Sequence, residues 1–236
     1  MNDVSARVAR LDWTRIAHEL DADGLAVTPP LLSAAECRAM AALWDRPATF
    51  RRHIDMAQHR FGSGEYRYFA EPLPPIVASL RHEAYAGLAP LANRWAAALG
   101  SHERFPDRLP EFIARCAAAG QRRPTPLLLR YTAGGYNCLH QDVYGAVAFP
   151  LQLTILLSRP DVDFAGGEIL LVEQRPRAQS RGQAVALARG QAVIFPNRHR
   201  PAVGLRGTYR VTVRHGVSDV RSGERRTLGV IFHDAE

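Results

Sequence analysis

Lysine is absent from this chain of 236 residues, and all 30 basic side chains are arginine. The absence runs through the whole sequence, so it reflects a general bias rather than a choice at single positions. The formal net charge is +7 and the isoelectric point is about 9.9. This positive charge favours polyanionic partners such as nucleic acid. The number of arginines alone is a weak argument for guanidinium-specific recognition.

Cysteine is also scarce. The three cysteines are Cys37, Cys116 and Cys138, and no two of them form a CxxC pair. The spacing disfavours a zinc knuckle or a redox pair. Cys138 lies close to His140, but we interpret it as a small, partly buried residue beside a site rather than a ligand or nucleophile.

Long apolar runs are missing as well. No run approaches the ~20 residues that a membrane-spanning helix needs, and the first residues lack the apolar core of a secretory signal. We therefore expect a soluble, cytoplasmic protein with no membrane partner. The apolar fraction of 47% is sufficient for a proper hydrophobic core, which excludes a disordered chain.

The first half of the sequence predicts helices. Residues 6–20 carry apolar side chains at helical spacing, and Ser33 with Glu36 forms a capping-box pattern before another apolar run. Residues 73–100 predict one or two helices interrupted near Pro90, and residues 110–120 a shorter helix that stops at glycine.

The second half predicts β-structure. From Pro124 onward, short β-rich runs such as LLLRY and QAVIFP alternate with Gly, Pro, Asn and Asp at spacings near ten residues. This pattern favours an antiparallel sandwich or barrel. We expect one α+β domain over residues 1–236. Its mainly helical part, residues 1–123, would pack outside a β-rich part, residues 124–236.

A histidine and an aspartate lie two residues apart just before an apolar run. In extended chain, His140 and Asp142 would point to the same side and could converge on one metal ion. Oxygen-activating Fe(II) enzymes use two histidines and one carboxylate, so a second histidine must come from a later strand. His215 is a candidate, because Arg225 follows it at a distance of ten residues, with Gly223 between them.

Four ordered motifs carry a resemblance to a known family: LHQD, GGEILL, RGQAVIF and HGVSDVRSGERRTLGVIF. In this order they resemble the Fe(II)/2-oxoglutarate-dependent dioxygenases, especially the prolyl-4-hydroxylase-like branch. The whole sequence is also similar to a bacterial family of 2-oxoglutarate oxygenases predicted to act on damaged or alkylated nucleic acid, through stretches such as GEYRYF, GQRRPTPLLLRY and RHGVS.

The resemblance implies a double-stranded β-helix, or jelly roll, with Fe(II) held by His140, Asp142 and His215. His199, which Arg210 follows at nearly the same spacing, is the alternative second histidine. We prefer His215, because Gly223 and Arg225 match the family's turn. His199 lies in a Pro-flanked, arginine-dense stretch that we expect to be an exposed loop.

The resemblance also assigns the co-substrate site. Arg225 would pair with the distal carboxylate of 2-oxoglutarate, because a guanidinium offers a planar fork of two donors to a carboxylate. Thr227, on the same face of the strand, would donate a hydroxyl to that group. Tyr131, on the strand before the HxD pair, would also bind the co-substrate. Dioxygen would be the other co-substrate. Because Arg225 would hold 2-oxoglutarate, it joins the three metal ligands in the predicted catalytic set.

The substrate is less constrained. Residues 50–69 interleave arginines with aromatics, which is typical of a lid that stacks a base and grips phosphates. They could equally be a loop with aromatics in the core and arginines in solvent. The arginine-rich stretch 198–226, which includes Arg206, could line a basic groove or form a solvated face.

The preferred function is hydroxylation of a C–H bond in an alkylated DNA or RNA base, leading to oxidative demethylation as in DNA repair. A protein or peptide hydroxylase of the prolyl type is the alternative, and a small-molecule oxygenase is a third possibility. A non-catalytic jelly-roll binding module is disfavoured by the complete set of His140, Asp142, His215 and Arg225.

Overall fold

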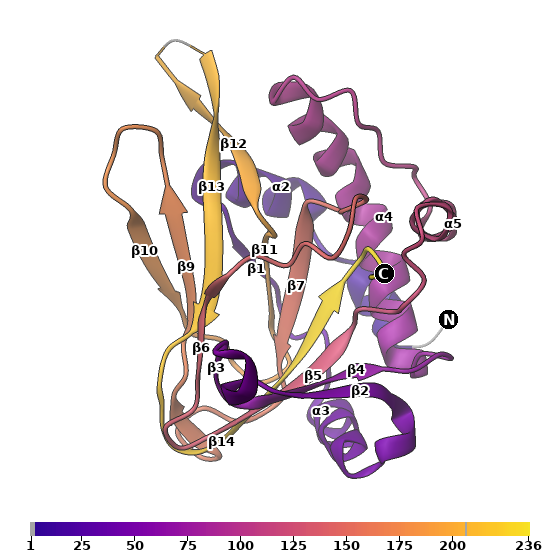
Figure 1. Ribbon diagram of the computed structural model, residues 1–236, viewed down its shortest axis with the longest axis vertical. Coiled ribbons are helices and arrows are strands. Elements are labelled where there is room, and N and C mark those ends of the chain that lie inside the picture. The colour runs from indigo at the N-terminus through magenta and orange to yellow at the C-terminus, as the bar shows by residue number, and fades with distance from the viewer. Residues whose placement is uncertain (1–2, 206) are drawn as a thin grey trace.

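Two antiparallel β-sheets face each other, and the helices lie outside them (Figure 1). The structure is a computed structural model that describes residues 3–205 and 207–236. Arg206, one of the arginines of the basic stretch, lies outside the described residues. The α-helices of the described part are α1 Asp3–Ala9, α2 Trp13–Asp23, α3 Ala34–Ala42, α4 Pro75–Ala98 and α5 Leu109–Ala118.

The larger sheet has eight strands in the order β1-β11-β7-β14-β5-β4-β2, and β8 also pairs with β14. Their bounds are β1 Ala26–Val27, β2 Phe50–Asp55, β4 Glu65–Phe69, β5 Leu127–Thr132, β7 Leu151–Leu156, β8 Phe164–Gly166, β11 Ala192–Pro196 and β14 Val220–Ile231.

The smaller sheet has six strands in the order β10-β9-β13-β6-β3, with β12 paired to β13. Their bounds are β3 Gly62–Ser63, β6 Tyr136–His140, β9 Ile169–Gln174, β10 Arg181–Val185, β12 His199–Gly204 and β13 Gly207–Val217. In Figure 1 this sheet lies on the side away from α4 and α5.

Strand alternation divides the core into two layers. On β14, Leu228 and Val230 pack toward the helices, in the same apolar cluster as residues of α4. Arg225 and Thr227 have the opposite parity and line the cavity between the sheets. Successive side chains of a strand point to opposite faces, so one strand supplies both the helix-packed core and the site.

Residues 50–69 contribute β2 and β4 to the larger sheet and β3 to the smaller one. Strand β2 pairs with β4, and β4 pairs with β5, in register Tyr66 opposite Leu129. The larger sheet therefore takes strands from both sides of the predicted division at residue 123. Phe69 is fully buried, while Arg52 and His53 are exposed. Whether this hairpin also acts as a lid stays a prediction.

Two helix predictions need correction. The predicted helix over residues 6–20 is two helices, because Asp12 caps the start of α2 by accepting a hydrogen bond from the Arg15 N–H at 2.9 Å. Residues 73–100 contain one uninterrupted helix, α4, with Pro90 inside it. Leu88 and Leu91 are buried on either side of the proline, so core packing outweighs the lost backbone hydrogen bond.

The loop predicted around His199 is also wrong. His199 begins strand β12, pairs with Thr212 of β13 and is half-buried. The next residue, Arg200, is fully buried and forms an ion pair with the buried Glu173 of β9. Local sequence suggested exposure because the stretch is rich in arginine, whereas a distant carboxylate allows one of these arginines to be buried.

Among the described residues, no helix is both long enough and apolar enough to cross a bilayer.

Candidate active site

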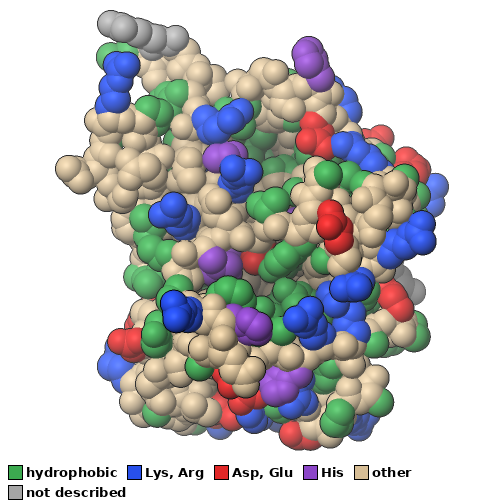
Figure 2. All heavy atoms as spheres, viewed as in Figure 1, with side chains coloured by type: hydrophobic (Ala, Val, Ile, Leu, Met, Phe, Trp, Pro, Cys, Tyr) green, Lys and Arg blue, Asp and Glu red, His purple; other side chains and the backbone are tan. Residues whose placement is uncertain are grey.

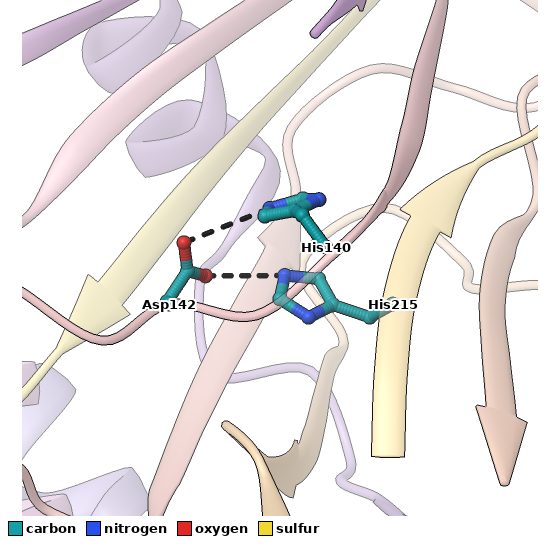
Figure 3. Close-up of side chains that lie close together, drawn as sticks. All are labelled: His140, Asp142 and His215. Atoms are coloured by element: carbon teal, nitrogen blue, oxygen red, sulfur yellow. Dashed lines mark ion pairs between the residues drawn. The ribbon is translucent and has the colours of Figure 1, made fainter. Parts of the chain in front are cut away.

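The smaller sheet brings two histidines together. His215 of β13 lies opposite His140 of β6 in the antiparallel ladder, and their ring centroids are 4.2 Å apart. Asp142 follows two residues after β6 ends, and its carboxylate turns back toward both rings (Figure 3). The candidate ligand atoms of the three residues all lie within 4.8 Å of one another.

A hydrogen bond orients the His140 imidazole. Its Nδ1–H donates to the carbonyl oxygen of Cys138 at 2.8 Å, and its Nε2 faces Oδ1 of Asp142 at 3.6 Å. The Nε2 of His215 lies 3.1 Å from Oδ2 of Asp142. Both rings thus present Nε2 to the same carboxylate.

The charge states suit a divalent cation. Burial alone would raise the pKa of Asp142, but His215, His140 and the Tyr144 hydroxyl outweigh it and hold that pKa well below its usual range. Burial and the neighbouring His140 lower the pKa of His215, against the opposing pull of Asp142. A neutral imidazole and an ionised carboxylate that point lone pairs at each other need a shared proton or a cation between them. Two neutral imidazoles with one carboxylate fit Fe(II).

A cavity of about 370 Å³ extends from these three residues into the space between the sheets. Arg225 lines it from β14 and is only 2% exposed. Its Nε and Nη1 have no hydrogen-bond partner among the described residues. Burial lowers the pKa of Arg225 to about 10, so the guanidinium stays charged at neutral pH. A buried cation of this kind is costly unless an anion pairs with it.

The other two predicted co-substrate residues lie beside this guanidinium. Tyr131 of β5 is directly opposite Arg225 in the sheet, with its ring centroid 5.7 Å from the guanidinium carbon. Its hydroxyl accepts a hydrogen bond from Asn137 at 3.3 Å. Thr227 is buried and lines the same cavity. The structure therefore brings together all the predicted site residues.

The GGE motif has a packing explanation. Gly167 has a φ of +65°, and a Cβ at this position would lie 2.7 Å from Cδ of Arg225. Only glycine tolerates both the backbone conformation and the close approach. The motif thus leaves room for the arginine side chain.

Sequence reasoning missed Tyr144. Its hydroxyl donates a hydrogen bond to Oδ1 of Asp142, and its ring packs edge-on against Tyr68, with centroids 6.3 Å apart. The only signal in the sequence is its position two residues beyond the aspartate. His199 is not part of the three-residue cluster, and neither is the buried His233.

The fold and the site define a jelly roll with a candidate metal cluster in the cavity between its sheets. Residues 64–235 match a family described as oxygenase, catalysing oxidative methylation of damaged DNA. An uncharacterized protein of Mycobacterium tuberculosis is 50% identical over 167 residues, which cover 71% of this chain and 72% of that protein. The chain therefore belongs to this oxygenase family.

Solved structures agree on the fold. A prolyl-4-hydroxylase from Pseudomonas putida is 15% identical, with a TM-score of 0.54 over 95% of this chain and 100% of that one. An oxidoreductase of the 2OG-Fe(II) oxygenase family from Burkholderia pseudomallei is 16% identical, with a TM-score of 0.56 over 96% of this chain and 94% of that one. The predicted α+β jelly roll is confirmed. The family match confirms the predicted oxygenase, and the His-Asp-His cluster is compatible with the predicted Fe(II) site.

Proposed function

We propose that this oxygenase removes alkyl groups from nucleic-acid bases, with His140, Asp142 and His215 as the Fe(II) ligands. One observation carries the assignment of the site. A compact His-Asp-His cluster and an unpaired, buried guanidinium line the same cavity. A metal ion would satisfy the first, and the distal carboxylate of 2-oxoglutarate would satisfy the second.

The chain's own residues would divide the work. Arg225 would hold the distal carboxylate through two parallel N–H donors, and Thr227 would add a hydroxyl donor from the same face of β14. Tyr131 and the apolar residues around it would keep water away from the co-substrate. Bound Fe(II), 2-oxoglutarate and dioxygen would supply the oxidation of a C–H bond, with succinate and carbon dioxide as co-products.

The substrate assignment rests on chemistry and charge. The cavity wall carries flat aromatic side chains, including Tyr66, Tyr68 and Phe61, which suit a planar base. The net charge of +7 favours a polyanion. The family description names damaged DNA and methylation. An oxygenase of this kind has no methyl group to donate. Hydroxylation of an N-methyl group, in contrast, yields formaldehyde and the unmethylated base, so we assign the reaction as demethylation.

A peptide hydroxylase is the second candidate, favoured by the structural similarity to a prolyl-4-hydroxylase. That similarity is at 15% identity and concerns the fold. Its substrate would have to place a peptide side chain in the same cavity. The two candidates share every step except recognition of the substrate, so turnover with defined substrates separates them.

Two measurements test the proposal. Anaerobic titration of the Fe(II)-loaded protein with 2-oxoglutarate should produce the visible charge-transfer band of the chelate, and Asp142→Ala should abolish it. Aerobic incubation with methylated oligonucleotides should then release formaldehyde and succinate in equal amounts. Succinate formation stimulated only by peptides would replace the nucleic-acid assignment with the hydroxylase. Absence of the charge-transfer band would refute the metal site itself.

A further inference from the structure

Exposed apolar side chains gather where the cavity opens. Phe61 is 47% exposed and Leu139 is 44% exposed, and both line the cavity. Tyr136 and Val143, from the same strand and the loop after it, are also exposed. Figure 2 shows a hollow with hydrophobic side chains inside it and with arginine and histidine side chains around it. An exposed apolar patch beside a catalytic cavity is typical of a binding surface.

The most exposed aromatic of this patch belongs to a stacked pair. The Phe61 ring lies nearly parallel to the His59 ring, with centroids 5.3 Å apart and an interplanar angle of 22°. Arg60, between them in sequence, also lines the cavity. One short turn therefore offers a flat aromatic face and a cation within one residue of each other.

Backbone hydrogen bonds hold this turn against the metal site. The Phe61 carbonyl accepts from the Cys138 N–H at 2.8 Å, and the Cys138 carbonyl accepts from the His140 ring. On the other side, the Phe61 N–H donates to the carbonyl of the buried Met56 at 3.0 Å. Phe61 is thus hydrogen-bonded to Cys138, which lies two residues before the candidate metal ligand His140, so its aromatic ring is held in place next to the metal site.

We propose that residues 57–63 form a stacking platform for the nucleotide next to the one whose base enters the cavity. The partner is single-stranded nucleic acid, or a strand unpaired at this point. This inference rests on the proposed function and names the form of its substrate. An aromatic ring can stack on any base, because every base has a flat face, and Arg60 would take the adjoining phosphate.

The platform also explains why the flat face is left in solvent. A base paired within a duplex has its faces covered by its neighbours, so Phe61 could reach it only after that base is unstacked, which costs free energy. A peptide offers no regular succession of flat faces. A strand of unpaired bases fits both the aromatic ring and the neighbouring cation.

The test uses the whole chain of 236 residues and short single-stranded oligonucleotides that carry 2-aminopurine beside a methylated base. The fluorescence of 2-aminopurine falls when this base stacks on an aromatic ring. Phe61→Leu keeps an apolar side chain but removes the flat face, and should raise Kd about tenfold with loss of the quenching. Phe61→Trp should restore both. As a control, Val203→Ala changes an exposed apolar residue of strand β12, outside the cavity lining, and should change neither. Equal affinity and quenching in wild type and Phe61→Leu would overturn the platform.

Two further readouts separate this proposal from the proposed function. The loss of kcat/KM in Phe61→Leu should be about tenfold larger for an oligonucleotide than for a methylated mononucleoside, which has no neighbouring base. Arg60→Gln should lower the slope of log Kd against log salt concentration by about 1, the value expected for the loss of one phosphate contact. If wild type demethylates oligonucleotides and Phe61→Leu does so with unchanged KM, the platform fails while the function stands. If no methylated nucleoside or oligonucleotide turns over, the function fails.

Discussion

The hydroxyl of Tyr144 donates a hydrogen bond to Oδ1 of Asp142, the carboxylate that also lies 3.1 Å from His215 through Oδ2. The tyrosine thus fixes the rotation of the one acidic side chain in the His-Asp-His cluster. Removal of a group that orients a metal ligand in this way usually lowers metal affinity about 10- to 100-fold.

Replacing this hydroxyl should weaken metal binding. Tyr144→Phe keeps the ring and its packing on Tyr68 but leaves Asp142 free to rotate, so Kd for Fe(II) should rise about 10-fold or more. Anaerobic Fe(II) titration measures this. Tyr85→Phe is a matched control, because its hydroxyl donates to the Pro106 carbonyl instead. Equal Fe(II) affinity in wild type and Tyr144→Phe would show that the hydrogen bond has no role in orientation.

The choice between two histidines can be tested directly. His215→Ala removes a side chain within bonding distance of a shared metal and should lower Fe(II) affinity at least about 100-fold. His199→Ala should leave Fe(II) affinity unchanged, since His199 is not part of the cluster. The reverse pattern in the same titration would mean that the metal is held elsewhere.

Arg225 should affect the co-substrate and not the metal. Arg225→Met removes the buried cation, so Kd for 2-oxoglutarate should rise about 100-fold or more while Fe(II) affinity stays the same. Without ligand, the variant should be at least as stable as wild type, because an unpaired buried charge is replaced by an apolar side chain of similar length. Calorimetric binding and thermal unfolding check both parts. A clear loss of stability in the unliganded variant would argue against an unpaired guanidinium.

The ion pair of Arg200 with Glu173 should be a large contributor to stability. Both side chains are buried, so Arg200→Met leaves the Glu173 carboxylate with only the more distant and exposed Arg175, at 3.7 Å. The change should lower the free energy of unfolding by about 3–5 kcal/mol. Urea denaturation measures the change. Arg210→Met, on the solvent face of the neighbouring strand, should cost less than about 0.5 kcal/mol. A double variant, Arg200→Met with Glu173→Leu, should recover most of the loss.

His233 should make stability depend on acid pH. Burial lowers its pKa to about 4, while its unfolded value is near 6.5. The unfolded state therefore binds more protons, and stability should fall as the pH drops from about 6.5 to 4. His233→Asn, which keeps an acceptor for the Phe149 N–H, should flatten this slope. Thermal unfolding across this range tests it, and identical slopes for the two proteins would contradict the assignment.

Much of the site could be read from local pattern. The HxD pair, the strand that carries Arg225 and Thr227, and the strand that carries Tyr131 were predicted from short motifs, and these residues do line one cavity. On β13, Arg210 and Arg214 lie on the exposed face. The face on which each of these side chains lies follows from strand parity, which repeats every two residues and is therefore a local property of the sequence.

Other features depend on partners far away in sequence. His199 and His215 have similar neighbours, and only the pairing of β13 with β6 places His215 opposite His140. Tyr144 became a site residue because the chain turns back after β6. Strand β12 was mistaken for a loop because Arg200 is buried by Glu173, which lies 27 residues earlier.

The sequence alone thus indicated the fold class, the chemistry and the candidate ligands, because its ordered motifs resemble those of a known oxygenase family. Tertiary structure decided which histidine joins the cluster, that Arg225 is buried with Nε and Nη1 unpartnered among the described residues, and how residues 50–69 extend both sheets. The physical reason is that burial and convergence are set by strand pairing over long separations, and no local run of residues contains that information.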